Sequence, residues 1–311
     1  MLSFFESISV IISPCFKPAL SAGPFFVISA IYIPSLKFIF EFRYGITSLS
    51  YAYIPIVVCS KLPVFLKLSI TPFTTFIGIA KPIPSAEEIL SLKPDVVFIY
   101  NWGKAEMVDN LRELGIKVVV VKGPKSIADV KENVKLIAKT LGEEDKGNLM
   151  IAKMDDKLAE IKEKVDNIKP EERKKLVLIS LMTSYGGKGC TFDDICQYAG
   201  VINGVSDAGL HNGQFLTKEM LVAINPDLLI MPVYNDHNTF DIEKYNKEFL
   251  DDPALQTLNA VKEKRFFYPR EGYIYNSSQD IVFGVQEVAR AAYGELFSQP
   301  ENCHISVAEI N

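Results

Sequence analysis

Two segments of the chain carry the same pattern of polar and hydrophobic positions. Residues 85–99 read SAEEILSLKPDVVFI, and residues 217–231 read TKEMLVAINPDLLIM. In each copy a hydroxyl residue suited to cap a helix precedes a short amphipathic run, and a proline prevents that helix from continuing. A run of apolar, mostly branched residues follows, which is typical of a parallel strand buried on both faces. The repeat therefore predicts two similar α/β lobes.

The chain after Phe76 continues this alternation of helical and strand-like patterns. Apolar residues recur every three or four positions in some segments and form short uninterrupted runs in others. The pattern predicts helices at 104–114, 126–142, 143–169, 191–200 and 281–293, and strands at 116–121, 176–182 and 265–268. We therefore expect an α/β protein with two lobes of mainly parallel sheets flanked by helices.

The longest periodic segment runs from Glu143 to Lys169. Its apolar residues alternate in steps of four and three, which places them along one side of a single helix: Met150, Met154, Leu158, Ile161, Val165 and Ile168. Pro170 stops the helix, and about twenty-five residues at the helical rise span on the order of 37 Å. We expect this helix to join the two lobes stiffly.

The pattern predicts five stretches along the chain. They are an atypical apolar segment without an assigned fold at 1–76, an incomplete N-terminal lobe at 77–142, the connecting helix at 143–169, the C-terminal lobe at 170–297 and a tail at 298–311. The first of these carries few charges, and prolines interrupt its uncharged run at 18–36, which is nearly long enough for a membrane helix. No basic residue precedes its first apolar run, so we recognise no export signal.

Charge and cysteine content narrow the function classes. The formal net charge of −5 over 311 residues provides no basic face, so we expect no nucleic-acid partner. The five cysteines are irregularly spaced, which indicates neither a disulfide scaffold nor a paired Cys-x-x-Cys metal site.

Candidate binding residues follow the predicted strands. In open α/β sheets the ligand lies beyond the carboxyl ends of the strands, so two facing lobes predict a ligand cleft between them. Tyrosine and tryptophan rings offer flat apolar faces, and a guanidinium pairs with anionic oxygens. The candidates in these loops are Tyr100, Trp102, Tyr185, Tyr234, His237, Arg270, Tyr273 and Tyr275.

Further phrases accompany the repeat and the long helix. GCTFDD at 189–194 leads to Ala199-Gly200, Asp252-Pro253 leads to LNAVK at 258–262, and the last helix reaches Tyr293 and Phe297. In order and spacing, the chain from about Ile77 to Phe297 resembles the substrate-binding proteins of ABC importers for iron-siderophores, haem and cobalamin. Members normally begin the first lobe with a strand, a ligand-facing loop and a helix, for which 1–76 shows no counterpart.

The resemblance implies a transport function without catalysis. It implies a monomer outside the cytoplasm that captures an iron-siderophore-type chelate, haem or cobalamin as cargo, with no resident cofactor or metal. It also implies docking on a membrane permease through one glutamate of each lobe, at the positions of Glu87 and Glu219. Two carboxylates on two rims can pair with two arginines, although each also complements the dipole of its own helix.

Two other interpretations remain open. One is an enzyme component that holds a metallocofactor in the same two-lobed architecture, although no catalytic set occurs at a recognisable spacing. The other is a membrane-attached sensor or a non-functional product with an aberrant N-terminus, which the composition of 1–76 brings into consideration. Fold analogy alone does not decide among them.

Overall fold

The computed structural model describes residues 56–61, 74–79, 85–101, 105–180, 184–233, 241–301 and 303–307. The described chain divides between Gly123 and Pro124 into two compact units, which we call the N-terminal and the C-terminal unit. Both combine parallel strands with covering helices, so the predicted α/β class is confirmed.

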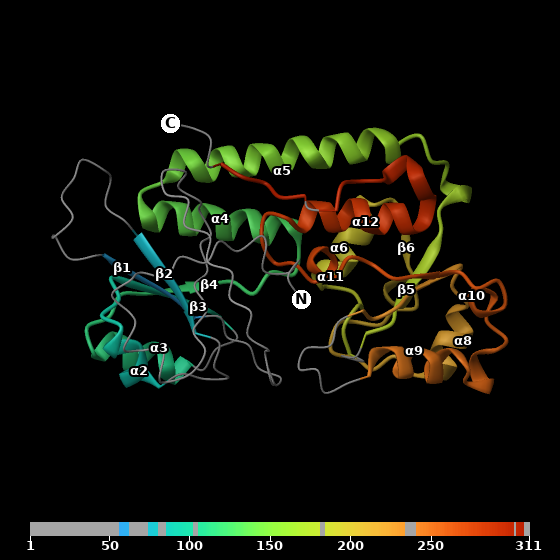
Figure 1. Cartoon of the computed structure of the whole chain (residues 1–311), viewed down its shortest axis with the longest axis horizontal. Helices are drawn as coiled ribbons and strands as arrows, with labels where there is room; N and C mark the ends of the chain where they lie inside the picture. Colours follow the sequence, from blue (N-terminus) through green and yellow to red (C-terminus); the bar gives the residue numbers. More distant parts are fainter. Residues whose placement is uncertain are drawn as a thin grey trace. The chain divides into compact units, whose positions relative to one another are not determined.

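The N-terminal unit contains a sheet with the strand order β2-β1-β3-β4 among its described residues. Its elements are β1 (Ile56–Lys61), β2 (Thr74–Ile79), α2 (Ala86–Ser91), β3 (Val96–Tyr100), α3 (Ala105–Glu113) and β4 (Val118–Val121). Helices α2 and α3 lie on one face of this sheet (Figure 1). Their packing buries a small core of Ile89, Val97, Ile99, Val108, Leu111 and Ile116.

The sheet of the N-terminal unit is mixed, which the sequence did not predict. Strands β3 and β4 are parallel, but β1 pairs antiparallel with both β2 and β3. Strand β1 lies inside the segment 1–76 that the sequence left without a fold, and β2 overlaps its end. Antiparallel strands at the side of a parallel sheet are common, and they show no helical spacer that would mark them in the sequence.

The C-terminal unit is built around a parallel sheet with the strand order β6-β5-β7-β8. Its strands are β5 (Lys175–Leu178), β6 (Ile202–Asn203), β7 (Leu228–Ile230) and β8 (Phe266–Phe267). Its helices are α4 (Ile127–Leu141), α5 (Glu144–Val165), η4 (Pro170–Glu172), α6 (Thr191–Tyr198), α7 (Gly204–Asp207), α8 (Lys218–Ile224), α9 (Ile242–Leu250), η5 (Pro253–Leu255), α10 (Asn259–Lys262), α11 (Glu271–Ile274), α12 (Ile281–Tyr293) and η6 (Gly294–Phe297).

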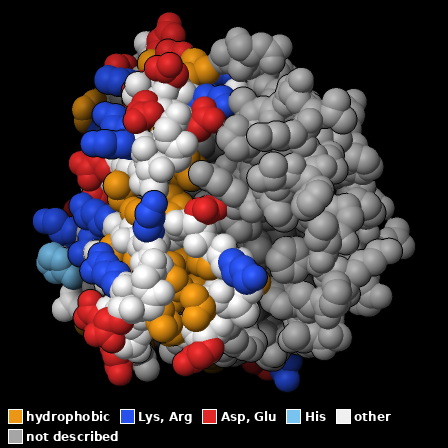
Figure 2. Space-filling view, turned by 90° about the vertical axis from the view of Figure 1, so that its left-hand side faces the viewer, with side chains coloured by type: hydrophobic (Ala, Val, Ile, Leu, Met, Phe, Trp, Pro, Cys, Tyr) orange, Lys and Arg blue, Asp and Glu red, His pale blue; other side chains and the backbone are white. Residues whose placement is uncertain are grey.

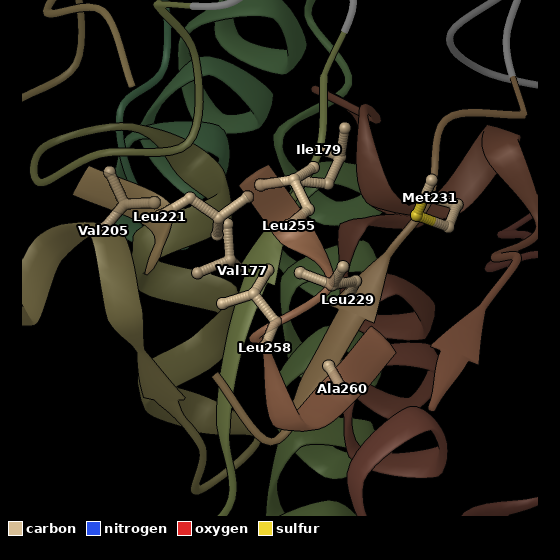
Figure 3. Close-up of a cluster of buried hydrophobic side chains, with 9 residues drawn as sticks. All are labelled: Val177, Ile179, Val205, Leu221, Leu229, Met231, Leu255, Leu258 and Ala260. Carbon is tan, nitrogen blue, oxygen red and sulfur yellow. The ribbon is translucent and has the colours of Figure 1, made fainter. Parts of the chain in front are cut away.

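Helices cover both faces of this parallel sheet. On one face, side chains from β5 and β7 meet those of α7, α8, η5 and α10 (Figure 3) in one cluster: Val177, Ile179, Val205, Leu221, Leu229, Met231, Leu255, Leu258 and Ala260. Successive strand residues alternate between faces, so Leu176, Leu178 and Ile230 point to the other side, where α12 packs. Burial on both faces explains the uninterrupted apolar runs in the sequence.

Helix α5 has the predicted apolar side. Met150, Met154, Leu158, Ile161 and Val165 are all buried. The helix ends at Val165, four residues before the predicted end at Lys169. It packs along α4 and α12, and Gly147 of α5 comes so close to Ala138 that no side chain fits between them. Both α4 and α5 therefore belong to the C-terminal unit, which begins well before the predicted lobe boundary at 142/143.

Asp194 joins α6 to the start of α4. Its Oδ2 accepts a hydrogen bond of 2.6 Å from the backbone N–H of Ile127, the first residue of α4. Burial nevertheless raises the pKa of this carboxyl above its usual value, because the charged form loses its hydration.

Replacing Asp194 by asparagine is expected to stabilise the protein at pH 7. A raised folded-state pKa means that the folded protein binds the proton more tightly than the unfolded chain, so this group's contribution to stability falls as the pH rises above the unfolded value of about 3.9. Asparagine keeps an oxygen acceptor for Ile127 and carries no charge. Urea unfolding at pH 7 and pH 4 should show a gain for Asp194→Asn at pH 7 that diminishes at pH 4.

Glu160→Gln provides the control of opposite sign. A hydrogen bond from Lys157 holds the pKa of Glu160 below its usual value, so the loss from this substitution should be present at pH 7 and shrink as the pH falls. A gain for Asp194→Asn that does not change between the two pH values would contradict the burial argument.

Candidate functional site

The structure describes seven of the ten predicted site residues. Trp102, Tyr234 and His237 lie outside the described residues, so their predicted roles stay predictions. Of the described residues, Tyr100 and Glu87 belong to the N-terminal unit, and Tyr185, Glu219, Arg270, Tyr273 and Tyr275 belong to the C-terminal unit.

Tyr100 is the last residue of β3 and is half-buried. Burial raises the pKa of its phenol, so the side chain is neutral at physiological pH. The next residue, Asn101, ties the end of β3 to the chain beyond β4. Its N–H donates to the carbonyl of Val121 at 2.8 Å, and its Oδ1 accepts from the N–H of Gly123 at 2.8 Å. The loop after this strand therefore starts from a fixed point.

Tyr185 and Tyr275 form an aromatic pair in the C-terminal unit. Their ring centroids are 5.7 Å apart and the ring planes are inclined by 37°, which is within the favourable range for paired aromatic rings. The Tyr185 hydroxyl is hydrogen-bonded to Thr191 Oγ1 at 2.9 Å, and burial raises the pKa of this phenol. The pair brings together two candidates that lie ninety residues apart in sequence.

A buried polar network fixes the loop that carries Tyr185. Asn203 Nδ2 donates to the carbonyl of Gly186 at 2.8 Å and to Asp193 Oδ1 at 2.9 Å. Gly187 packs against the main chain of His211, where an added Cβ would lie 2.7 Å from the carbonyl carbon. Asn203 and Asp193 are both buried. The glycine-rich loop is thus a rigid support for Tyr185.

The polar ends of Arg270 and Tyr273 are bonded to the protein's own C-terminal segment. The Arg270 guanidinium donates to the carbonyl of Gln299 at 3.0 Å and to that of Pro300. The Tyr273 hydroxyl accepts from the N–H of Cys303 at 2.7 Å, and the carbonyl of Glu301 lies 3.0 Å away as an acceptor. The structure therefore brings these two candidates together, with their polar ends bonded to residues 299–301 and 303.

Glu87 and Glu219 occupy equivalent places in the two units. Each is the second residue of its helix, α2 or α8, and each side chain is exposed. Hydrogen bonds from the backbone N–H of Glu219 and from the Thr217 hydroxyl hold the pKa of the Glu219 carboxyl below its usual value. The carboxylate is therefore charged, and it also stabilises the N-terminus of α8.

The equivalence of the two copies extends to the backbone that follows these helices. Lys93 and Asn225, each directly before the proline, have φ angles of 47° and 43°, in the left-handed region that non-glycine residues rarely adopt. The repeat in the sequence is therefore a repeat in conformation.

The described surface carries charges of both signs. Figure 2 shows Lys and Arg side chains interspersed with Asp and Glu on the described part of one face. Within the described residues no cluster of three or more His, Cys, Asp or Glu is arranged to hold a metal ion. Among the same residues, no helix combines the length and the apolar character needed to cross a membrane.

Sequence reasoning missed the residues that support the candidates. The sequence predicts only a tail at 298–311, because its short polar stretches have no helical or strand periodicity. Asn203 carried no signal, since its role depends on a contact with residues ten and seventeen positions earlier. In the sequence, Asp193 and Asp194 stand out only as part of the phrase GCTFDD at 189–194.

Residues 82–271, more than half of the chain, match the family model described as periplasmic binding protein, and the chain belongs to this family. An uncharacterized ABC transporter substrate-binding lipoprotein of Bacillus subtilis, YvrC, is 25% identical over 224 residues, which are 69% of this chain and 67% of that protein. The molybdate-binding protein MolA of Haemophilus influenzae is 22% identical over 234 residues, 68% of this chain and 64% of MolA.

A solved structure has the same fold. The periplasmic heme-binding protein RhuT from Roseiflexus sp. RS-1, in its apo form, superposes with a TM-score of 0.58 at 22% identity, covering 67% of this chain and 79% of RhuT. The predicted family and fold class are confirmed. The chain spans about two thirds of the length of the two curated relatives, and of these two only MolA is named for a ligand, molybdate.

Proposed function

We propose that this protein is the substrate-binding component of an ABC importer and that its cargo is a bulky metal chelate of the iron-siderophore, haem or corrinoid type. The observation that carries the proposal is the family match over 82–271, which includes both copies of the repeat and both glutamates. The Tyr185–Tyr275 pair supports a cargo with a flat face. We further propose that it acts outside the cytoplasm, which the family name periplasmic binding protein supports. We also propose that it is a monomer and catalyses no reaction.

Titration with hemin, a ferric tris-catecholate, cyanocobalamin and molybdate tests the cargo. Trp102 is the single tryptophan of the chain, so its fluorescence reports binding if the cargo comes near it. We expect the 311-residue chain to bind hemin, a ferric tris-catecholate or cyanocobalamin with a Kd of about 1 μM or below, corresponding to about −8 kcal/mol.

Calorimetric titration and the variant Trp102→Phe control for light absorption by the compounds. If molybdate is the only compound that binds, the cargo is an oxyanion and not a chelate. Molybdate is included because the Haemophilus relative is named for binding it. Failure of all four compounds in both assays would reject the proposed cargo class.

Uptake experiments test the docking role of Glu87 and Glu219. In cells that depend on this protein for import, Glu87→Ala and Glu219→Ala are each expected to reduce uptake at least about tenfold, which equals the loss of about 1.4 kcal/mol of docking energy. Binding of the cargo in solution should not change.

Glu106→Ala is the matched control. Glu106 is also the exposed second residue of a helix, α3, but it stands outside the repeat. If all three variants import normally, the two glutamates serve only their own helix dipoles.

A further inference from the structure

The C-terminal residues 299–301 and 303–305, which we call the strap, are bonded along α11 and α12. Gln299 Nε2 donates to the carbonyl of Phe283 at 3.1 Å and to Glu287 Oε2 at 3.2 Å. At the other end Asp280, whose side chain is buried, accepts from the N–H of Ile305 at 2.9 Å. These bonds hold one end of the strap on α12 and the other end on the N-cap residue of the same helix.

The middle of the strap holds the loop that carries Tyr275. Arg270 and Tyr273 are bonded to strap carbonyls, and Tyr273 also accepts from the N–H of Cys303. Tyr273 is buried and is the third residue of α11, and Tyr275 directly follows this short helix. A shift of this turn would move the Tyr275 ring relative to Tyr185, whose own loop is fixed by Asn203.

The polar groups of three candidate residues therefore already have hydrogen-bond partners within the protein. The Tyr185 hydroxyl is paired with Thr191, and the Tyr273 hydroxyl and the Arg270 guanidinium are paired with the strap. Withdrawing any of them toward a ligand would leave a partly buried donor or acceptor unpaired, at a cost of about 1–3 kcal/mol each. Ring faces carry no such penalty.

We propose that Arg270 and Tyr273 are positioning residues that act through the strap, and that the cargo meets the C-terminal unit on the ring faces of Tyr185 and Tyr275. Neither the hydroxyls of Tyr185 and Tyr273 nor the Arg270 guanidinium bonds the cargo or its metal. The ligand part of this inference rests on the proposed function. It narrows the cargo to compounds that present a flat conjugated or aromatic face, such as a porphyrin, a corrin or a catecholate.

Hydrogen exchange of the ligand-free protein tests the strap. Tyr273→Phe removes the hydroxyl that bonds Glu301 and Cys303 while keeping the ring. We expect amide exchange in 299–305 and 270–276 to accelerate at least about tenfold, since these amides open locally once the strap is released. Tyr268→Phe, at an exposed tyrosine of the same loop, should leave exchange unchanged. Unaltered exchange in Tyr273→Phe would overturn the strap's positioning role.

Binding of hemin, a ferric tris-catecholate and cyanocobalamin tests the ring faces. Tyr275→Phe should bind within about twofold of the unmodified protein, and Tyr275→Ala should lose about tenfold or more, the value of one aromatic contact. Tyr273→Phe should weaken binding several-fold, but only while the Tyr275 ring is present, because a positioning residue and its target are not additive. If Tyr273→Phe causes the same loss of affinity in the unmodified protein and in Tyr275→Ala, the positioning role is overturned.

Visible absorption distinguishes ring contact from metal ligation. The spectra of bound hemin and of the bound ferric catecholate should be the same in Tyr185→Phe and Tyr275→Phe as in the unmodified protein. A band that disappears in either variant would identify a phenolate ligand and overturn the inference.

The outcomes separate this inference from the proposed function. Failure of the unmodified protein to bind any of the compounds rejects the proposed function and the ring-face contact together, while hydrogen exchange still decides the strap. Tight binding that Tyr275→Ala does not alter keeps the proposed function and rejects the ring-face contact. Binding of molybdate alone also rejects it, because that anion has no conjugated face.

Discussion

Replacing Glu287 by alanine is expected to lower the free energy of unfolding by about 3–5 kcal/mol. Glu287 lies in the middle of α12, and its carboxylate is fully buried. One oxygen accepts from the backbone N–H of Arg270 at 3.0 Å and from Arg290 Nη2 at 2.8 Å, and the other accepts from Gln299 at 3.2 Å. Removing the carboxylate leaves these donors unpaired in the interior, and the guanidinium keeps its charge.

A double-mutant cycle with Arg290 distinguishes the unpaired charge from lost packing. The pair Glu287→Leu and Arg290→Met removes both charges at similar volume, so we expect the double variant to be more stable than Glu287→Leu alone. Urea unfolding followed by circular dichroism measures the stability of Glu287→Leu, Arg290→Met and the double variant. Glu295→Ala, an exposed carboxylate just beyond α12, should stay within about 0.5 kcal/mol of the unmodified protein. A loss below about 1 kcal/mol in Glu287→Ala would contradict the role assigned to the buried pair.

Glu287 also illustrates what the sequence could not reveal. A glutamate in an apolar helix predicts a surface position, because charged side chains are rarely buried unless paired. Its partners come from the residue before α11, from α12 and from the strap, and only the tertiary structure brings them together. The period of α12 fixed its bounds at Ile281 and Tyr293 correctly, but it did not indicate that a carboxylate would face inward.

The repeat was the most reliable signal for the fold. Its capping residue, its proline and its apolar run are local features, and local features determine where a helix ends and a strand begins. Strands β3 and β7 and helices α2 and α8 follow it closely. Pairing across the sheet is non-local, so the antiparallel β1 and β2 and the early unit boundary at Gly123 were not predicted.

The candidate site was only partly predictable for the same reason. Position after a strand selected Tyr185 and Tyr275 as candidates, and their rings lie side by side in the structure, since parallel strands bring their loops to one edge. Residue type alone also selected Arg270 and Tyr273. It could not show that a segment thirty residues later would bond their polar ends.

Replacing Gly284 by alanine is expected to destabilise the protein by about 3 kcal/mol, the upper end of the usual range for an overpacked site. Gly284 faces α11 from within α12. An added Cβ would overlap the backbone carbonyl oxygen of Tyr273 and lie 3.1 Å from its carbonyl carbon. A main-chain group cannot rotate away as a side chain can, so α11 or α12 would have to move.

The sign of this effect is diagnostic, because helix propensity alone predicts a gain of about 0.5–1 kcal/mol for glycine to alanine. Gly204→Ala serves as the comparison. The two nearest atoms there are methyl groups of Ile224 and Val177, at 2.7 and 3.0 Å, which can shift, so a smaller loss is expected. Urea unfolding measures both variants. A rise in the unfolding midpoint of Gly284→Ala would show that α11 does not rest directly on α12, and the strap would then have no fixed base from which to position Tyr275.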